Sequence, residues 1–454
     1  MTILWAKQAL TAEGWQSDVR VEIAPDGRIA AVSGGAARCG LQLATLLPAP
    51  VNLHSHGFQR ALAGLAEGRG PTTGDSFWTW RQLMYRFLER LTPEAVEAIT
   101  AFAQLEMLEA GFAAVAEFHY LHHQADGSGY RQPAAMARRV VAAAQSSGIG
   151  LTLLPVLYQY GGCDRRPLGP GQARFGNSLE GFARLHEDAA LALRALPADA
   201  RLGLAPHSLR AVDPEGLAEV LTLAGDGPVH IHVAEQAAEV ADVQAALGAR
   251  PVEWLLANAG VGPRWCLVHC THMLPQETVA LARSGAVAGV CPITEANLGD
   301  GIFDAVRYLE AGGQLGVGSD SNVRISLLEE LRLLEYSQRL RDGSRAALAT
   351  AQLSTGRRLF GLVCRGGALA AGRDSGEIAV GKWADLLALR EDTPDQLIAR
   401  GDTCLDSLVF TGDNRSICDV WSAGRHLVRD GRHCRRDAIL RAYAGTLRQL
   451  KESL

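Results

Sequence analysis

Two histidines separated by one residue are the first sign of chemistry in this sequence. His54 and His56 follow a short apolar run, and in an extended strand side chains two positions apart point to the same face. Both imidazoles can therefore bind one metal ion, and imidazole nitrogen is a common ligand of zinc. Two structural histidines, each hydrogen-bonded to a backbone carbonyl, explain the same pattern. The pair alone leaves both interpretations open.

Three later apolar runs end in the same kinds of side chain. One ends with His232 and Glu235, the next with His269 and the last with Asp320. If these runs are strands of one barrel, the three groups lie with His54 and His56 at its C-terminal rim, where the catalytic groups of such barrels are found. The alternative of structural histidines and an Asp320 that caps a helix requires several independent coincidences. The four clusters together therefore predict a metal centre.

The elements that must position these clusters alternate along the chain. From about Leu41 to Leu362, short β-prone runs are followed by helical stretches rich in Ala, Leu, Glu and Arg. Such alternation predicts a parallel sheet, and eight units within this length predict that the sheet closes. We therefore expect an α/β fold with a (β/α)₈ TIM barrel over residues 46–363. The predicted strands are Leu46–Leu53, Ala113–Tyr120, Gly150–Tyr158, Arg201–Pro206, Pro228–Ala234, Trp265–Cys270, Ala286–Cys291 and Gln314–Gly318.

The two ends of the chain have a different pattern. Residues 1–45 and 364–435 contain short β-like segments, and each end is too small to bury a core of its own. We expect both ends to combine in one small β-sandwich domain, followed by an amphipathic C-terminal helix over residues 436–454. The predicted strands of the small domain are Val19–Ile23, Ile29–Val32, Gly376–Val380, Asp385–Leu389, Ile417–Ser422 and His426–Val428.

Composition narrows the class of protein. The 454 residues are 48% hydrophobic and 20% charged, as expected of a globular enzyme, and the net charge of −5 comes without any block of Lys or Arg. Nucleic acid and anionic membranes are therefore disfavoured as partners. The nine cysteines never occur as C-x-x-C, which disfavours a disulfide framework or a thiolate zinc site. No export signal is recognisable, so we expect a cytoplasmic protein.

The motifs H-x-H, H-x-x-E, a single His and G-S-D resemble those of the amidohydrolase superfamily, specifically its deaminase branch. The segment Gly376–Leu386 is similar to the part of those enzymes that re-enters the small domain, so the resemblance spans the chain. It implies a hydrolase of C=N bonds that binds one divalent metal ion, for which we expect Zn²⁺, and that forms a homodimer. The implied metal ligands are His54, His56, His232 and Asp320, and the implied catalytic residues are Glu235, His269 and Asp320.

The scarcity of lysine supports one metal ion rather than two. Binuclear members of this superfamily commonly bridge their ions with a carboxylated lysine on the fourth strand. Here lysine occurs only at Lys7, Lys382 and Lys451. The fourth predicted run, which continues to Arg210, also lacks a glutamate that could take its place. Zinc, Fe(II) and Mn all accept imidazole and carboxylate, so the sequence leaves the metal open.

Four further stretches bear on the substrate: His56–Ala61, Phe77–Arg81, Glu117–Tyr120 and Pro206–Arg210. They resemble those of the deiminases of histidine degradation, which hydrolyse N-formimidoyl-L-glutamate to N-formyl-L-glutamate and ammonia. A substrate with two carboxylates requires two anion sites, and arginine binds carboxylates with two parallel hydrogen bonds. The candidate substrate-binding residues are Gln59, Arg81, Tyr120, His207 and Arg210.

Two other functions fit the same scaffold. A deaminase of a purine, pterin or other heterocycle would have aromatic rings rather than paired arginines around its substrate. A metal-free scaffold protein would not need the complete set of metal ligands, so the full set disfavours it. The glycine-rich segment Gly64–Gly74 lacks a phosphate-loop lysine, and we expect it to be a mobile loop over the barrel mouth.

Overall fold

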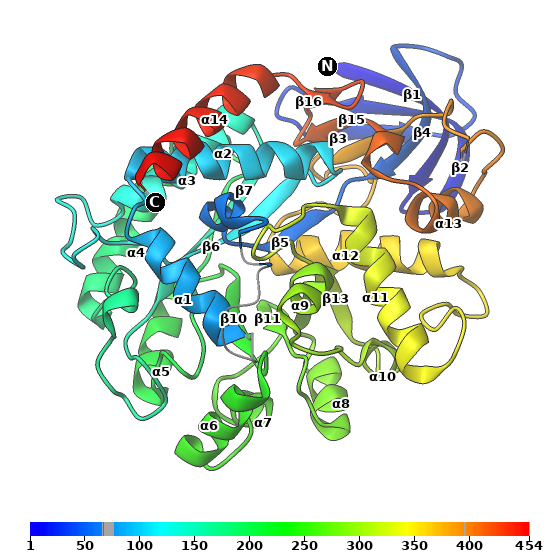
Figure 1. Ribbon diagram of the computed structural model, residues 1–454. Helices are drawn as coiled ribbons and strands as arrows, with labels where there is room; N and C mark the ends of the chain where they lie inside the picture. The colour runs from blue at the N-terminus through cyan, green and yellow to red at the C-terminus, as the bar shows by residue number, and fades with distance from the viewer. Residues whose placement is uncertain (66, 68–76, 395, 454) are drawn as a thin grey trace.

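A closed barrel of parallel strands forms the centre of the protein (Figure 1). The computed structural model describes residues 1–65, 67, 77–394 and 396–453. Each predicted barrel run contains strand residues, and neighbouring runs pair in parallel. The strands are β5 (Val51–Ser55), β6 (Ala114–His119), β7 (Gly150–Leu157), β8 (Arg201–Leu202) with β9 (Ala205–Pro206), β10 (Val229–Val233), β11 (Trp265–His269), β12 (Val287–Val290) and β13 (Gln314–Val317).

Two parallel bridges close the barrel. The hydrogen-bonded strands form two groups, β5 to β9 and β10 to β13. Leu204 pairs with Val229 at one junction, and Ser55 pairs with Asp320 at the other. The second junction is also part of the candidate site, because the Asp320 N–H donates to the His54 carbonyl at 2.9 Å. The closure of the barrel therefore brings the first and last motifs of the sequence together.

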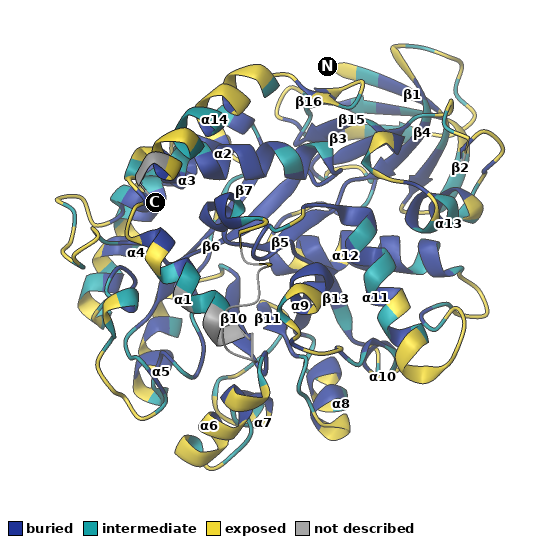
Figure 2. Cartoon of the chain, in the orientation of Figure 1, coloured by how far each residue is buried: buried dark blue, intermediate teal, exposed yellow. Residues whose placement is uncertain are grey.

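Helices surround the barrel and turn their buried faces toward the strands (Figure 2). Several begin at a side chain that accepts a backbone N–H of the first turn, such as Thr92, Ser178 and Asp213, which is a common way to start a helix. The helices are α1 (Phe77–Leu88), α2 (Pro93–Glu109), α3 (Ala135–Ser147), α4 (Leu179–Leu193), α5 (Pro214–Leu221), α6 (Ala237–Leu247), α7 (Pro251–Asn258), α8 (Pro275–Ser284), α9 (Pro292–Leu298), α10 (Ala305–Glu310), α11 (Leu327–Asp342) and α12 (Thr355–Ala370).

The two chain ends share one eight-stranded sheet beside the barrel, in the order β17-β16-β15-β14-β4-β1-β2-β3. The antiparallel pair of β14 and β4 joins the C-terminal strands to the N-terminal ones. One face buries a small apolar core that includes Leu4, Val21 and Trp421. The strands are β1 (Thr2–Thr11), β2 (Gly14–Ile23), β3 (Ile29–Ser33), β4 (Leu41–Pro48), β14 (Leu386–Leu389), β15 (Ile417–Ser422), β16 (Arg425–Arg429) and β17 (Arg432–His433).

Several predicted boundaries differ from the structure. The run Leu46–Leu53 divides at Pro50 between β4 of the small sheet and β5 of the barrel, since proline cannot donate to a strand ladder. The segment Gly376–Val380 is not a strand, although Ile378 packs in the small core. The predicted boundary between residues 363 and 364 lies inside α12, which packs against β13 and β5 of the barrel. Residues 402–410, expected in the β domain, form helix α13 (Asp402–Phe410).

The C-terminal helix is present as expected. Helix α14 (Arg436–Ser453) lies along α2 (Figure 1), and the rings of Phe102 and Tyr443 stack with their centroids 4.0 Å apart. In the described part of the chain, no helix has the length and apolar character needed to cross a membrane. Most of the predicted Gly64–Gly74 loop lies outside the described residues.

A buried charge network connects the barrel to the small sheet. The Arg373 guanidinium donates to both oxygens of Asp385, at 2.6 and 2.8 Å, and to Asp199 at 2.9 Å. Arg425 of β16 donates to both oxygens of the same Asp199 at 2.8 Å. Arg373, Asp199 and Asp385 are all buried. Because unpaired charges are costly in the interior, this network holds the two parts of the fold in one arrangement.

Candidate active site

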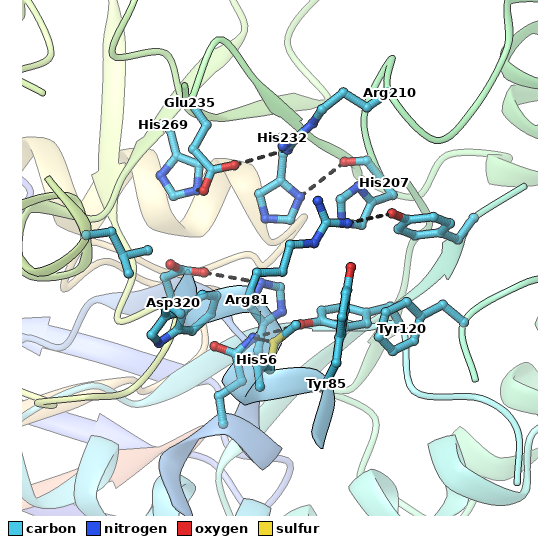
Figure 3. A pocket seen from close by; sticks show the side chains of 16 residues that line it. His56, Arg81, Tyr85, Tyr120, His207, Arg210, His232, Glu235, His269 and Asp320 are labelled. Atoms are coloured by element: carbon cyan, nitrogen blue, oxygen red, sulfur yellow. Dashed lines mark hydrogen bonds and ion pairs between the residues drawn. The ribbon is translucent and has the colours of Figure 1, made fainter. Parts of the chain in front are cut away.

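A pocket of about 540 Å³ lies at the C-terminal ends of the barrel strands (Figure 3). Side chains with charge or hydrogen-bonding groups meet aromatic rings in it. The lining residues are His56, Gln59, Trp80, Arg81, Met84, Tyr85, Tyr120, Tyr158, Phe175, His207, Arg210, His232, Glu235, His269, Leu298 and Asp320. The predicted site residues, apart from the buried His54 below, all line this one pocket.

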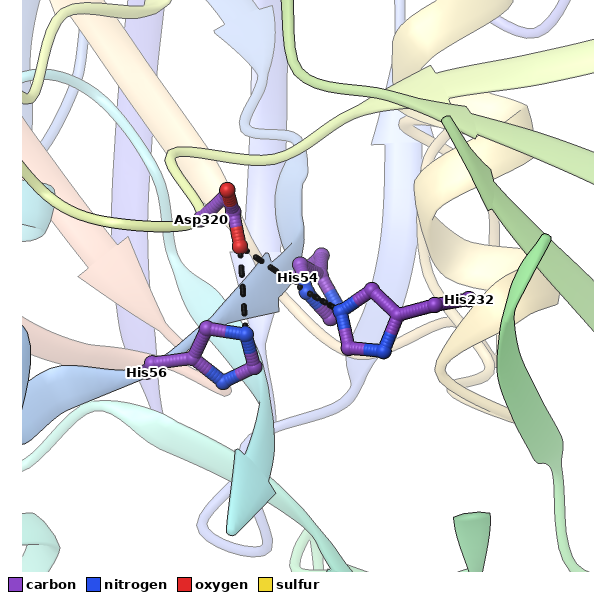
Figure 4. A group of neighbouring side chains, drawn as sticks. All are labelled: His54, His56, His232 and Asp320. Carbon is purple, nitrogen blue, oxygen red and sulfur yellow. Dashed lines mark hydrogen bonds and ion pairs between the residues drawn. The ribbon is translucent and has the colours of Figure 1, made fainter. Parts of the chain in front are cut away.

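The four predicted metal ligands meet at the floor of the pocket (Figure 4). The Nε2 atoms of His54 and His56 lie 3.1 and 3.2 Å from the Asp320 Oδ1 atom. The His232 Nε2 atom lies 3.2 Å from the His54 Nε2 atom. All four side chains are buried. Three imidazoles and one carboxylate thus direct one donor atom each toward a common point.

This arrangement fits a single zinc-like ion. Ligand atoms at ~2.0–2.1 Å from one tetrahedral ion stand about 3.3 Å apart, close to the separations observed here. The Nδ1 atoms of His56 and His232 lie 2.9 and 3.1 Å from the carbonyls of Phe118 and His207. Those carbonyls accept the Nδ1 protons and leave Nε2 free for the ion.

The charge states of the ligands also suit an ion. Burial lowers the pKa of His54 to about 3, so its imidazole is neutral. Burial alone would raise the pKa of Asp320, but the neighbouring His54 and His56 side chains outweigh it and hold that pKa well below its usual value. A neutral imidazole and an ionised carboxylate are the forms that bind a metal.

Unusual backbone conformations aim several of these side chains. Ala234, His269 and Asp320, which follow or end strands β10, β11 and β13, have φ angles of +51°, +73° and +44°. Such left-handed residues are unfavourable unless their surroundings hold them. The Asn322 amide donates to the carbonyls of His56 and Asp320 at 3.1 and 3.0 Å and so secures the last of these turns.

Glu235 and His269 lie next to the ligand cluster, as the resemblance implied. The Glu235 Oε1 atom lies 3.9 Å from the His269 Nε2 atom, and the Glu235 Oε2 atom lies 3.1 Å from Arg210. Burial lowers the pKa of His269, but Glu235, Glu295 and Asp320 outweigh it and raise that pKa to about 10. His269 can therefore donate a hydrogen bond toward the centre of the site.

Glu295 of α9 is a site residue that the sequence reasoning missed. Its Oε1 atom lies 3.3 Å from the His269 Nδ1 atom and accepts the Cys291 backbone N–H at 2.8 Å. His269, Cys291 and Glu295 form a second buried group of possible ligands. Glu295 contacts both the His269 ring and the Cys291 backbone, so we interpret it as a residue that orients His269.

The two predicted arginines line the same pocket. Arg210 donates to Glu235, while its Nε and Nη1 atoms are buried and have no hydrogen-bond partner among the described residues. Arg81 of α1 donates to the Tyr158 hydroxyl at 2.9 Å, and its guanidinium lies 5.3 Å from the centroid of the Tyr85 ring. Two cationic side chains therefore share the pocket with Glu235 and Asp320.

Gln59, Tyr120 and His207 lie between the ligands and the arginines. The Gln59 amide donates to the Tyr120 hydroxyl at 2.7 Å, and the Gln59 Oε1 atom is buried without a partner among the described residues. Burial, together with Arg210 and Arg81, lowers the pKa of His207 well below its usual value. His207 is therefore neutral and offers one donor and one acceptor. The structure brings all five predicted substrate-binding residues to one pocket.

Five other histidines of the barrel lie outside the ligand cluster. One ring nitrogen in each of His230, His122 and His123 lies within 2.9 Å of a carbonyl, those of Ala370, Val156 and Gly176. These three histidines are therefore core or supporting residues. His119 and His272 also lie outside the cluster.

The sequence did not predict the aromatic wall of the pocket, which is formed by Tyr85, Tyr158 and Phe175. These residues come from α1, the end of β7 and the loop before α4. They carry no motif, and only the packing of distant segments brings them together. Trp80 also lines the pocket, whereas the side chain of Trp78 lies outside the described residues.

Comparison with known proteins agrees with this geometry. Residues 45–427 match the model of the amidohydrolase family, and residues 1–40 match the formimidoylglutamate deiminase HutF N-terminal domain. The formimidoylglutamate deiminase of Pseudomonas aeruginosa is 50% identical over 99% of this chain and 100% of its own length. The 8-oxoguanine deaminase of the same organism is 30% identical over 82% of this chain and 81% of its own.

A solved structure shows the same fold. The crystal structure of an amidohydrolase from Brucella melitensis superposes with a TM-score of 0.95 at 47% sequence identity. The match covers 99% of this chain and 100% of the other. The barrel and the small sheet are therefore both shared with a protein of the same length.

Proposed function

The chain belongs to the amidohydrolase family, and from this we propose that it hydrolyses N-formimidoyl-L-glutamate to N-formyl-L-glutamate and ammonia. The observation that carries the proposal is the pair of arginines in the pocket. Arg81 and Arg210 line the same pocket as the metal-binding and acidic groups, as a substrate with two carboxylates requires. The relative that is 50% identical to this chain, over 99% of the chain's length, is named for that activity. The protein is thus a deiminase, a hydrolase of amidine C=N bonds.

His54, His56, His232 and Asp320 would hold the metal ion. A divalent ion bound there lowers the pKa of a water and supplies an activated nucleophile near neutral pH. We propose zinc because three neutral imidazoles and one carboxylate are a donor set that zinc prefers. The lack of a lysine between residues 8 and 381 favours one ion.

The protein side chains then move the protons. The water oxygen bonds to the formimidoyl carbon, and Asp320 accepts a proton from the attacking water. Asp320 passes this proton to Glu235, which gives it to the imine nitrogen. Glu235 then takes the proton of the hydroxyl group on the tetrahedral carbon and gives it to the departing amine, so the carbonyl forms, the carbon–nitrogen bond breaks and ammonia leaves. His269 donates a hydrogen bond to the attacking oxygen, where negative charge develops. The product that remains is the formyl amide.

The arginines recognise the glutamate part of the substrate. Arg210 has buried, unpartnered Nε and Nη1 atoms on the two edges of its guanidinium, and each can donate to a substrate carboxylate oxygen. Arg81 offers a second cationic group for the second carboxylate. Gln59, Tyr120 and His207 add neutral hydrogen-bonding groups beside the arginines. Remote binding of this kind positions the formimidoyl carbon over the ligand cluster.

One assay distinguishes this proposal from heterocycle deamination, to which the aromatic wall and the 30% identical relative give weight. Ammonia release would be measured from N-formimidoyl-L-glutamate, guanine, cytosine and adenosine at equal concentrations. We expect turnover of N-formimidoyl-L-glutamate at a kcat/KM at least ~100-fold above that of any heterocycle. Preference for a purine would overturn the dicarboxylate assignment.

We propose that the protein forms a homodimer, as the family resemblance implies, and that its ligands are small substrates with two carboxylates. Light scattering of the purified protein would measure the oligomeric state.

A further inference from the structure

Arg210 contacts a catalytic group as well as the space for the substrate. Its Nη2 atom lies 3.1 Å from the Glu235 Oε2 atom and 3.9 Å from the Glu239 Oε2 atom. The guanidinium is therefore paired with carboxylates of the protein before any substrate binds. Figure 3 shows Arg210 and Glu235 joined above His232.

The contact makes the two oxygens of Glu235 different. Oε2 accepts from Arg210, whereas Oε1 points toward His269 and lies 3.9 Å from its Nε2 atom. Glu239 fixes the backbone of the same turn, because its carboxylate accepts the N–H groups of Ala234 and Glu235 at 3.2 and 2.9 Å. Arg210 thus completes a frame that leaves only Oε1 for proton transfer.

One guanidinium has enough donors for both tasks. Nη2 binds Glu235, and the buried Nε and Nη1 atoms have no partner among the described residues. A substrate carboxylate can accept from Nε or from Nη1, which lie on opposite edges of the guanidinium, while the contact between Nη2 and Glu235 persists. Arginine can therefore bind the substrate carboxylate without giving up its contact with Glu235. In a side chain with a single nitrogen, such as lysine, the two contacts would compete.

We propose that Arg210 is a positioning residue for Glu235, so that carboxylate recognition and orientation of the proton-transfer group share one guanidinium. The inference rests on the proposed deiminase function for the identity of the carboxylate. Loss of Arg210 then slows the chemical step in addition to weakening binding. A residue that only bound the substrate carboxylate would leave the rate on a substrate without a carboxylate unchanged.

The test is a kinetic comparison of Arg210→Met, Arg210→Lys and wild type. The substrates are N-formimidoyl-L-glutamate and N-propylformamidine, which has the reacting group but no carboxylate. Arg165→Met is the control, because the Arg165 side chain is 49% exposed and pairs with Asp213 and Glu215 outside the pocket lining. Metal content and thermal melting show that each variant is folded and loaded.

For Arg210→Met we expect the kcat for N-formimidoyl-L-glutamate to fall by ~10-fold or more, and KM to rise. We expect its kcat/KM for N-propylformamidine to fall by ~10-fold as well, although that substrate has no carboxylate to lose. The kcat of Arg210→Lys should also fall by ~10-fold, since a saturating carboxylate draws its single nitrogen away from Glu235. Arg165→Met should match wild type on both substrates.

An unchanged kcat in Arg210→Met, with normal rates on N-propylformamidine, would overturn the proposal and leave Arg210 as a binding residue. If Arg210→Met loses its metal, the test uses Arg210→Lys instead, and an unchanged kcat in that variant would overturn the proposal. If wild type does not hydrolyse N-propylformamidine, the kcat of Arg210→Met for N-formimidoyl-L-glutamate is the test, and an unchanged kcat would overturn the proposal. Failure of the proposed function is a separate result, in which wild type releases no ammonia from N-formimidoyl-L-glutamate.

Discussion

The Nε2 atoms of His54 and His232 lie 3.2 Å apart, although 178 positions separate the two residues in the chain. Two buried imidazoles direct the same ring atom at one point, and Asp320 directs a carboxylate oxygen at it. Such convergence of neutral nitrogen donors and one anion is characteristic of a cation site rather than of a hydrogen-bond network.

The first prediction concerns the ion itself. Purified protein should contain about one divalent ion per chain by elemental analysis, because one complete ligand cluster is present. Removal of the ion with a chelator should abolish ammonia release, and added Zn²⁺ should restore it. Asp320→Ala should be inactive even where some ion remains, since the same carboxylate accepts the proton of the water. A stoichiometry near two, with activity that follows the second ion, would contradict the mononuclear site.

The second prediction separates proton transfer from metal binding. Glu235→Gln keeps the size of the side chain but cannot carry a proton, so kcat should fall by ~10²-fold or more. Elemental analysis should find the metal content unchanged, because Glu235 is not in the ligand cluster. Glu180→Gln is the control, with a side chain that is 80% exposed on α4. Loss of metal from Glu235→Gln would show that its role is wrongly assigned.

The third prediction tests the orientation of His269 by Glu295. Glu295→Ala removes the acceptor of the His269 Nδ1 proton, so kcat should fall by ~10-fold or more with little change in KM. Glu295→Gln keeps a carbonyl acceptor and should recover most of the rate. Steady-state kinetics with N-formimidoyl-L-glutamate measure both variants. Equal defects in the two variants would mean that the carboxylate charge, not the hydrogen bond, is what matters.

The fourth prediction concerns Arg81. Arg81→Met should lower kcat/KM for N-formimidoyl-L-glutamate by ~100-fold, because a carboxylate left without its partner in a desolvated pocket costs about 3 kcal/mol. The defect should appear mainly in KM, since Arg81 donates to the Tyr158 hydroxyl on the aromatic wall of the pocket. Arg86→Met on the exposed side of the same helix is the control. A wild-type KM in Arg81→Met would remove Arg81 from the binding site.

The fifth prediction concerns stability and its dependence on pH. Asp199→Asn should lower the free energy of unfolding by about 3–5 kcal/mol, because it leaves Arg373 and Arg425 without their shared carboxylate. Denaturant unfolding measures the change. Asp164→Asn is the control, because its ion pair with Arg166 is exposed and such pairs contribute about 0–1 kcal/mol.

The pH dependence follows from the direction of one pKa shift. Burial would raise the pKa of Asp199, but Arg425 and Arg373 outweigh it and hold that pKa below its usual value of 3.8. The carboxylate therefore stabilises the fold above pH 3.8, and this contribution is lost as the pH falls through the lower folded-state pKa. Between pH 3.8 and that lower pKa, wild type should lose stability more steeply than Asp199→Asn. Parallel acid-unfolding curves would contradict the role of this network.

The sequence alone determined the fold class, the family resemblance and the position of the ligand cluster. Alternation along a strand places His54 and His56 on one face, and the C-terminal ends of parallel strands meet at one rim. Given eight strands in order, the convergence of His232 and Asp320 on those histidines requires no further information. These features depend on local periodicity and on a general rule of barrel topology. Both the periodicity and the rule can be applied to a single sequence.

The tertiary structure alone decided which side chains work together. Glu295 reaches His269 from a helix that follows the next strand, and Arg210 turns its guanidinium toward Glu235 as well as toward the pocket. The division of one apolar run at Pro50 likewise became visible only in the paired strands. Such contacts depend on side-chain directions and packing between segments that are distant in sequence, which neither spacing nor composition encodes. The sequence therefore located the catalytic groups, whereas the fold determined how they are oriented.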